Sequence, residues 1–255
     1  MTTTNDMRIY EVGGCVRDEL GQACGLDWQS KDVDYTVIGC SSFEEMIERL
    51  QVEKGFPEPF TTKEETYTAT FKVPDSMPEL LERTRVADFV WGRIDGPYTD
   101  GRHPDWVKPA TTLEDDQRRR DFTVNSMAKD PSTGQIFDPF GGGWDITNRT
   151  LRFVGDPGDR INEDGLRVLR GLRFMVTKGL RPTEGTKAAL RSQLAAECMT
   201  RPAVKKERIF EELVKMFNFD YRASLELLAN LPPWTKDAIF RDGVSLAPSL
   251  KGRKR

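Results

Sequence analysis

The chain has 255 residues, of which 31% are charged and 37% are apolar, and its formal net charge is -3. This length allows a substantial core and suits one large domain or two smaller ones. The charge excludes a protein that binds nucleic acid through overall basicity, so any such contact must come from local basic patches.

Residue types that hold metals through sulfur or imidazole are scarce. His103 is the one histidine, and no C-x-x-C pair occurs among the four cysteines, Cys15, Cys24, Cys40 and Cys198. These observations argue against a thiolate zinc site, a multi-histidine site and a Ser-His-Asp triad. Scattered thiols indicate a reducing, cytosolic setting. Residues 1–6 are polar and no long apolar run follows, so we expect neither a secretion signal nor a membrane span.

The first 150 residues are predicted to alternate between short strands and helices. Strands are expected at residues 7–12, 34–39, 66–73 and 84–91. A first helix is expected at residues 15–20, and Ser42 with Glu45 forms a capping-box pattern before a second helix at residues 43–50. Segments 121–129 and 134–140 flank a turn at residues 130–134, which predicts a hairpin.

Residues beyond about 151 are predicted to be helical. From Asn162 onward, apolar residues recur every three or four positions, at Leu166, Leu169, Leu172 and Val176. Further helices are expected at residues 187–199, 203–217 and 221–231, before a basic tail at residues 250–255. Strands followed by helices predict an α+β fold, with a head domain at residues 1–150 and an all-helical unit at residues 151–255.

Two aspartates, Asp32 and Asp34, begin one predicted strand. Residues i and i+2 of a strand point to the same side, so their carboxylates repel each other unless a cation joins them. Mg²⁺ suits such a pair because it prefers oxygen ligands and leaves room for phosphate oxygens. The pair therefore predicts a metal site, and the alternative is a solvated strand edge.

A glycine turn, Gly13-Gly14, precedes the first predicted helix. Backbone N–H groups at such a turn approach a phosphate closely, and a helix N-terminus favours negative charge. Arg17 would add a charge-assisted contact to a triphosphate. With the aspartate pair, the turn predicts a nucleoside-triphosphate site, although the turn alone is often only structural.

Three consecutive arginines, at residues 118–120, form the second signal. They adjoin a segment with buried character, so their charges require anions. A phosphate is one candidate. A solvated turn, or ion pairs with Asp115 and Asp116, are the alternatives.

The third signal is a predicted helix over residues 163–173. Glu163, Arg167 and Arg170 are spaced to share one face, and Asp164 and Arg167 are neighbours on the helix. A carboxylate accepts from an exocyclic amino group and a guanidinium donates to a ring nitrogen or carbonyl. This pattern favours cytosine and adenine over uracil and guanine. Ordinary ion pairs on a helix are the alternative.

Together these segments resemble the class II tRNA nucleotidyltransferase and bacterial poly(A) polymerase family, over most of the chain. The matching stretches are residues 12–20 (VGGCVRDEL), 31–39 (KDVDYTVIG), 98–130, 134–146 (GQIFDPFGGGWDI), 151–157 (LRFVGDP), 160–174 (RINEDGLRVLRGLRF) and 205–217 (KKERIFEELVKMF). The resemblance implies a polymerase-β-like head, a helical neck, and a template-independent enzyme that adds CCA to tRNA 3′ ends from CTP and ATP.

The resemblance also implies residue roles. Asp32 and Asp34 would bind Mg²⁺, and Asp88 would assist catalysis as a third acidic residue, with a surface carboxylate as its alternative. Asp121 would lie near the ribose. The nucleotide would be held by Gly14, Arg17 and Arg120, and its base and phosphates would be read by Asp164, Arg167, Arg170 and Arg173.

The chain departs from the family pattern in three places. Family members commonly continue into body and tail domains, whereas this sequence stops at Arg255. We therefore expect the chain to hold only the acceptor end of the RNA, to dimerise or to use its basic tail, with a solvated or disordered tail as the alternative to an RNA contact. Residues 19–31 are longer than the usual spacer, and Ser126 replaces a common alanine. Three other functions stay open: A-only or partial addition, an inactive RNA- or nucleotide-binding relative, and transfer to a small molecule.

Overall fold

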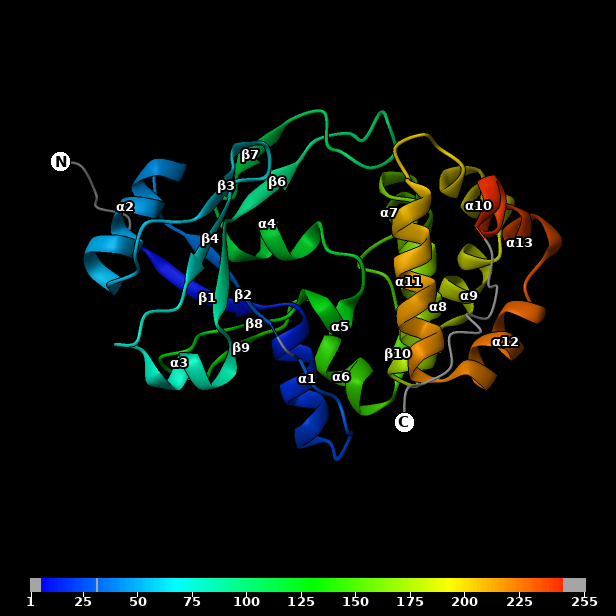
Figure 1. Cartoon of the computed structure of the whole chain (residues 1–255), viewed down its shortest axis with the longest axis horizontal. Coiled ribbons are helices and arrows are strands. Elements are labelled where there is room, and N and C mark those ends of the chain that lie inside the picture. Colours follow the sequence, from blue (N-terminus) through cyan, green and yellow to red (C-terminus); the bar gives the residue numbers. More distant parts are fainter. Residues whose placement is uncertain (1–5, 31, 245–255) are drawn as a thin grey trace, which may run out of the picture.

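The computed structural model describes residues 6–30 and 32–244, so the basic tail at residues 250–255 lies outside the described residues. The described chain has a mixed α/β half followed by a helical half (Figure 1). The predicted α+β fold is confirmed. No helix within these described ranges is both long and apolar enough to cross a membrane.

A seven-stranded sheet forms the centre of the first half, in the order β3-β4-β5-β2-β1-β8-β9. Its strands are β1 (Arg8–Val12), β2 (Val33–Ile38), β3 (Thr61–Lys63), β4 (Thr68–Lys72), β5 (Val86–Trp91), β8 (Ala128–Lys129) and β9 (Ile136–Phe137). The central strand β2 runs antiparallel to β1 and parallel to β5. Its register places Asp34 opposite Val12 on one side and Asp88 on the other.

Helices and a small hairpin surround this sheet. They are α1 (Gly14–Ala23), α2 (Phe43–Lys54), the 3-10 turn η1 (Glu64–Thr66), α3 (Pro78–Arg83), the hairpin strands β6 (Arg93–Asp95) and β7 (Val107–Pro109), α4 (Leu113–Arg118), α5 (Thr123–Ser126) and α6 (Gly142–Thr147). The predicted cap of α2 is confirmed, because the Ser42 side chain accepts a hydrogen bond from the Glu45 N–H.

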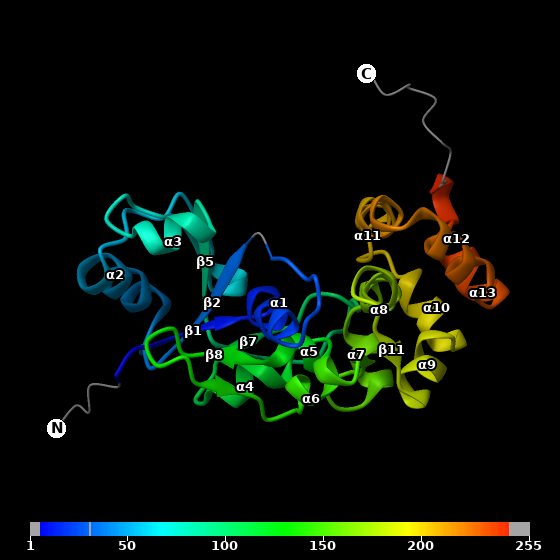
Figure 2. The ribbon, with the colours of Figure 1, turned by 90° about the horizontal axis from the view of Figure 1, so that it is seen from below.

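The second half is built around α8. Its elements are β10 (Thr150–Leu151), α7 (Pro157–Glu163), α8 (Leu166–Thr177), β11 (Arg181–Pro182), α9 (Glu184–Leu190), α10 (Gln193–Met199), α11 (Lys206–Phe219), α12 (Tyr221–Ala229), α13 (Pro233–Ile239) and the 3-10 turn η2 (Arg241–Gly243). The predicted apolar positions Leu166, Leu169 and Leu172 are buried. Helix α11 packs against α8 with buried Ile209 and Leu213 (Figures 1 and 2).

Three predicted elements differ from the structure, each for a local reason. The single helix expected at 187–199 is divided into α9 and α10, because Ser192 caps the second helix by accepting from Ala195 N–H. The predicted hairpin forms, but only β8 and β9 pair, since α5 takes up the segment before β8. The pattern after Asn162 forms α7 and α8 with a break at Asp164, followed by Gly165, whose close approach to the Cys198 carbonyl leaves no space for a Cβ.

The longer spacer at residues 19–31 is anchored by a tryptophan. Trp28 is buried, and an added Cβ at Gly21 of α1 would lie 2.4 Å from Trp28 Cε3. The Lys178 ammonium of the helical half lies 5.3 Å from the centre of the Trp28 ring. The spacer therefore contributes packing to the head and a contact to the helical half.

The close contact between Gly21 and Trp28 predicts a costly substitution. Gly21→Ala should lower the free energy of unfolding by about 1–3 kcal/mol, because the methyl group must displace a packed ring. Urea denaturation measures the change. Gly185→Ala is the matched control, since an added Cβ in α9 meets no atom within 4 Å and should be neutral or slightly stabilising. Equal stability of the two variants would contradict the packing role of Trp28.

Candidate active site

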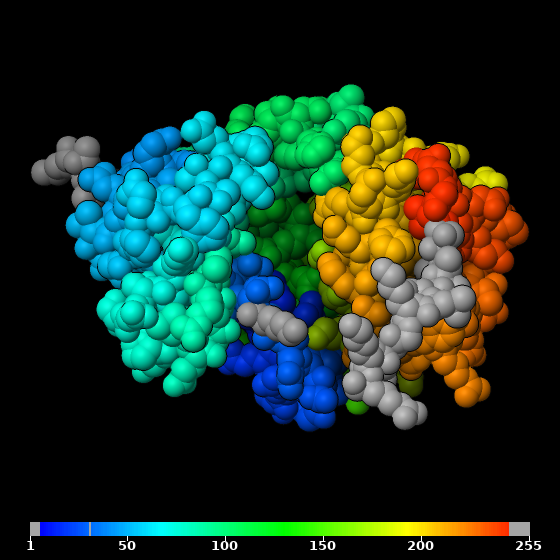
Figure 3. Space-filling model, viewed as in Figure 1, coloured from blue at the N-terminus to red at the C-terminus, as the bar shows by residue number. Residues whose placement is uncertain are grey.

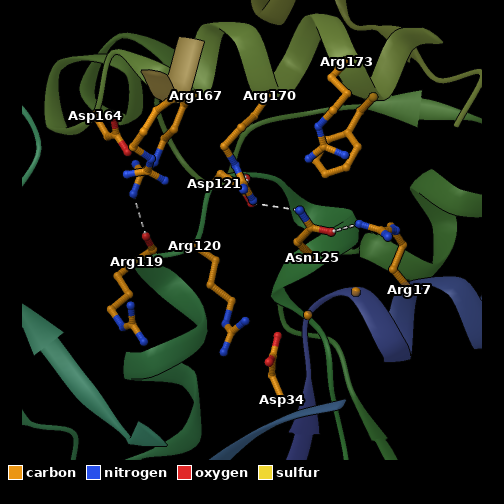
Figure 4. Close-up of a pocket in the computed structure, with 14 residues that line it drawn as sticks. Arg17, Asp34, Arg119, Arg120, Asp121, Asn125, Asp164, Arg167, Arg170 and Arg173 are labelled. Atoms are coloured by element: carbon orange, nitrogen blue, oxygen red, sulfur yellow. Dashed lines mark hydrogen bonds and ion pairs between the residues drawn. The ribbon is translucent and has the colours of Figure 1, made fainter. Parts of the chain in front are cut away.

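A hollow of about 410 Å³ lies between the sheet and the helical half (Figures 3 and 4). The predicted site residues that line it are Gly13, Gly14, Arg17, Asp34, Arg120, Asp121, Asp164, Arg167, Arg170 and Arg173. Arg119, from the predicted arginine run, also lines it, and Asn125, Phe174 and Arg208 line it without a predicted role. Asp32, Asp88 and Glu163 are outside this lining, so the structure gathers most of the predicted set but not all of it.

The turn between β1 and α1 forms one wall of the hollow. Gly13 has φ 76°, a left-handed conformation that favours glycine, and it directly precedes α1. A Cβ at Gly13 would lie 3.5 Å from Arg120 Nη1 and 3.8 Å from Asp34 Oδ2. The glycine turn, one predicted metal ligand and one arginine therefore meet at a single point. Figure 4 shows Arg120 and Asp34 pointing toward one another.

Carboxylates cluster on the neighbouring strands β2 and β5. Asp34 and Asp88 are register partners, and Asp88 Oδ1 is buried without a hydrogen-bond partner in the described residues. Partial desolvation by the surrounding protein raises the pKa of Asp34, although the residue is exposed; the charges of Asp88 and Asp32 raise this pKa further, and Arg120 opposes them. Asp32 is exposed as well, and it lines a different hollow from Asp34.

This arrangement fits a divalent cation. An orphaned buried carboxylate oxygen beside a second carboxylate is costly unless positive charge joins them. Within residues 6–30 and 32–244, no three His, Cys, Asp or Glu side chains are preassembled as a complete metal cage. Mg²⁺ does not require such a cage, because it commonly binds one or two carboxylates and completes its coordination shell with water and substrate phosphates.

A buried aspartate fixes the arginine run. Asp116 is fully buried; its Oδ1 lies 2.7 Å from Arg119 Nη2 and its Oδ2 lies 3.0 Å from Arg120 Nη2. Burial raises the pKa of Asp116, but the two guanidinium groups outweigh it and hold this pKa well below its usual range. The ion-pair interpretation of the run thus applies to Asp116. Asp115 instead caps α4 in a capping box with Thr112.

Among the described residues, Arg120 keeps an unpaired hydrogen-bond donor although it is paired with Asp116. Its Nε is buried without a hydrogen-bond partner in the described part of the chain, and its Nη1 faces the Gly13 turn. A donor left unpaired at this position suits an incoming anion. Arg118, in contrast, pairs with Glu114 on the surface and is outside the lining.

A chain of hydrogen bonds links the head to the helical half (Figure 4). Arg17 Nη1 donates to Asn125 Oδ1 over 2.7 Å, and Asn125 Nδ2 donates to Asp121 Oδ1 over 3.1 Å. Asp121 in turn pairs with Arg170 Nη2 of α8 at 2.6 Å. No role was predicted for Asn125, although it lies in the matching stretch 98–130. Its position as a polar residue among buried neighbours could have identified it.

Asp121 gives the site a pH-dependent contribution to stability. Burial raises the pKa of Asp121, but Arg170 and the Asn125 amide outweigh it and lower this pKa from 3.8 to about 2. A lowered folded-state pKa gives stability that is present above pH 3.8 and is lost as the pH falls toward 2. A shift of this size corresponds to about 2 kcal/mol.

We therefore expect acidification to remove the stability difference between the wild type and Asp121→Asn. At pH 6 the variant should unfold more easily by about 2 kcal/mol, and near pH 2 the difference should nearly vanish. Urea denaturation at pH 6, 4 and 2.5 measures this change. The surface variant Asp75→Asn is the control and should differ little from the wild type throughout. A stability difference for Asp121→Asn that is independent of pH would contradict the assignment.

Acidic and basic groups of α7 and α8 form the opposite wall. Asp164 Oδ1 accepts from the Leu166 N–H over 2.9 Å, and no hydrogen bond to its other oxygen occurs within the described ranges. Arg167 donates to the carbonyls of Arg160, over 3.0 Å, and Arg119, over 3.1 Å. Arg167 is thereby fixed at the junction of the two halves.

Glu163 occupies a supporting position. Its carboxylate pairs with both Arg160 and Arg167, and burial raises its pKa. The predicted contact between Glu163 and Arg167 is thus present, although the helix breaks between them. Glu163 is outside the lining of the hollow and its carboxylate is already paired. The structure therefore gives it no direct contact with a ligand in the hollow.

Several known proteins are similar to this chain in sequence and fold. Residues 9–152 match the poly(A) polymerase head domain. A CCA-adding enzyme of Streptococcus gordonii is 35% identical over 248 residues, covering 96% of this chain and 52% of the relative. One of Enterococcus faecalis is 38% identical over 210 residues, covering 81% and 44%.

Solved structures agree with these sequence matches. The CCA-adding enzyme of Bacillus stearothermophilus in complex with CTP aligns with a TM-score of 0.70 at 26% identity, covering 91% of this chain and 49% of that one. A tRNA nucleotidyltransferase complexed with a primer tRNA and an incoming ATP analog aligns with a TM-score of 0.66 at 26% identity, covering 92% and 60%. The chain spans about half the length of the curated relatives it matches. By the match over residues 9–152, the chain belongs to the family of tRNA nucleotidyltransferases and poly(A) polymerases that share the poly(A) polymerase head domain.

Proposed function

We propose that this chain is a template-independent nucleotidyltransferase that adds C and A from CTP and ATP to the 3′ end of tRNA. The observation that carries the proposal is the meeting of Asp34, Arg120 and the Gly13 turn beside an unpaired Asp88 oxygen. The names of the relatives support the choice of RNA and nucleotides. We also propose that residues 1–150 are the catalytic head, that residues 151–255 are a nucleotide-selecting neck, and that the protein acts in the cytosol.

In this proposal Asp32 and Asp34 hold Mg²⁺, with Asp88 as a third carboxylate beside them. When bound, the metal lowers the pKa of the attacking hydroxyl and offsets negative charge that develops on the phosphates. Gly13 and Gly14 bring backbone N–H groups to the triphosphate, and Arg17 and Arg120 add charge-assisted contacts.

The reaction follows from this placement. The RNA 3′ oxygen forms a bond to the α-phosphorus, the bond from that phosphorus to the bridging oxygen of the β-phosphate breaks, and pyrophosphate leaves. The 3′ hydroxyl gives up its proton to water as the new bond forms. Most of the acceleration comes from positioning and electrostatics, because the protein forms no covalent bond.

We propose that the opposite wall selects the base. Asp164 would accept from the exocyclic amino group of cytosine or adenine, and Arg167 would donate to a ring nitrogen or carbonyl. Glu163 would act through Arg167 by fixing its guanidinium. Arg170 and Arg173 would contact the nucleotide, while Asp121 would lie near its ribose and orient Arg170.

Incubation with tRNA that lacks its CCA end tests the proposal. Each labelled triphosphate is supplied alone and then in combination, and the products are sequenced. We expect C residues from CTP alone and a completed CCA, with no further growth, from CTP plus ATP. Long adenosine tails from ATP alone would instead support a poly(A) polymerase, and incorporation of no nucleotide by the folded protein would contradict the proposal.

A further inference from the structure

Among the arginines that line the hollow, Arg208 is the one without a carboxylate partner in the described residues. Those that line it are Arg17, Arg119, Arg120, Arg167, Arg170, Arg173 and Arg208. Each of the first six lies within 4 Å of a carboxylate: Asp18, Asp116, Asp116, Glu163, Asp121 and Glu212, respectively. The Arg208 guanidinium has no hydrogen bond or ion pair with any residue in the described ranges 6–30 and 32–244.

The surroundings of Arg208 are unfavourable for a cation. Its side chain is half-buried, and this burial, followed by the charges of Arg102 and Arg170, lowers its pKa. Asp164 and Glu212 oppose that effect, but Glu212 is already shared by Arg173 and Lys215. Burying a charge without a partner costs free energy, so this position favours an anion from outside the protein.

The helix that carries Arg208 adds to this preference. Arg208 is in the first turn of α11, a helix of 14 residues, and its backbone N–H already bonds to Lys205 O. The positive end of a helix dipole favours negative charge and disfavours a cation. Neighbouring charges and the helix end thus act in the same direction at a residue that faces the hollow.

On these grounds, and resting on the proposed function, we propose that Arg208 binds a phosphate oxyanion of the substrate. That phosphate belongs either to the incoming triphosphate or to the backbone of the RNA 3′ end, which share this chemistry. The position on α11, across the hollow from the Gly13 turn, makes Arg208 a contact from the helical half. It would complement Arg17 and Arg120, which approach from the head.

Two binding measurements with the full chain separate the sources. The dissociation constant of CTP is measured without RNA, and that of tRNA lacking CCA is measured without nucleotide, for the wild type, Arg208→Gln and Arg208→Lys. We expect Arg208→Gln to weaken one of them at least about tenfold, as loss of a charge-assisted hydrogen bond does. Loss in the first arm identifies the triphosphate, and loss in the second identifies the RNA backbone. Arg208→Lys should fall between, since it keeps the charge.

Stability without ligand separates binding from a structural role. Because Arg208→Gln removes a repelled cation, its melting temperature should equal or exceed that of the wild type. The matched control is Arg222→Gln, at an exposed arginine of α12 outside the lining, and it should change neither affinity.

Affinities of Arg208→Gln within twofold of the wild type in both arms would overturn the inference. So would a markedly lowered melting temperature with equal losses in both arms and no recovery in Arg208→Lys, because these indicate a structural residue. Failure of the proposed function is distinguishable. In that case the wild type transfers no nucleotide, whereas the dissociation constants of CTP and tRNA still report whether Arg208 binds phosphate.

Discussion

Replacing Asp34 by asparagine is expected to reduce nucleotide incorporation about a thousandfold or more. Asp34 is the carboxylate that meets both the Gly13 turn and Arg120, so its charge is the one best placed to hold a cation against a triphosphate. A thousandfold loss corresponds to about 4 kcal/mol of transition-state stabilisation, which is within the range that a bound metal supplies. Single-turnover incorporation of labelled CMP into tRNA measures the loss.

The same substitution should not weaken the fold. Partial desolvation and the neighbouring Asp88 raise the pKa of Asp34 although the residue is exposed, so the folded protein gains no stability from its charge. A neutral side chain of the same size should therefore leave the free energy of unfolding at pH 7 unchanged or raise it. Asp75→Asn, on the surface, should keep full activity. A folded Asp34→Asn protein with near-normal incorporation would refute the metal assignment.

Replacing Asp164 by asparagine is expected to relax base selection. Asparagine keeps an oxygen for the Leu166 N–H, which preserves the start of α8, but it presents an amide donor in place of a carboxylate oxygen. That donor suits the carbonyl of uracil or guanine where cytosine and adenine carry an amino group. Discrimination between CTP and UTP should fall about 10- to 100-fold, since a bidentate base contact is worth about 1–3 kcal/mol.

Competition between labelled CTP and UTP during incorporation measures this change. Asp159→Asn is the matched control, because this exposed carboxylate of α7 is outside the lining of the hollow. Unaltered discrimination in Asp164→Asn, at full incorporation of CMP, would exclude Asp164 as a base-reading residue and assign the choice of nucleotide to other residues.

Local patterns predicted the elements, and their limits explain what was missed. The β-branched run at residues 34–39 and the leucine spacing of α8 identify elements whose own residues decide burial. The break at Asp164 and the division between α9 and α10 depend on a backbone contact with Cys198 and on the Ser192 cap. The contact with Cys198 joins residues far apart in sequence, so a local pattern does not reveal it. The Ser192 cap lies within a stretch whose apolar spacing also suits one continuous helix.

The same limit applies to the site: local patterns identify some of its residues, but not those that only the fold brings together. Short motifs identified Gly13, Gly14 and Asp34, which line the same hollow, whereas Asp32 lies outside this lining. The pairing of Asp34 with Asp88 depends on a parallel register between strands separated by other elements, which a local pattern does not determine. Asn125 and Arg208 gain meaning only when α5 and α11 meet at the hollow, and neither carries a spacing signal of its own.

Attack by an RNA 3′ hydroxyl on a nucleoside triphosphate is the central claim, and one labelling experiment tests it most directly. CTP labelled at the α-phosphate is incubated with two forms of tRNA lacking CCA. One ends in a normal 3′ hydroxyl, and the other ends in a 3′-deoxynucleotide, which has no 3′ hydroxyl. We predict that label enters only the hydroxyl-ended RNA, with one pyrophosphate released for each nucleotide joined. Label that enters both RNAs equally, or that joins a small molecule in place of RNA, would contradict the account.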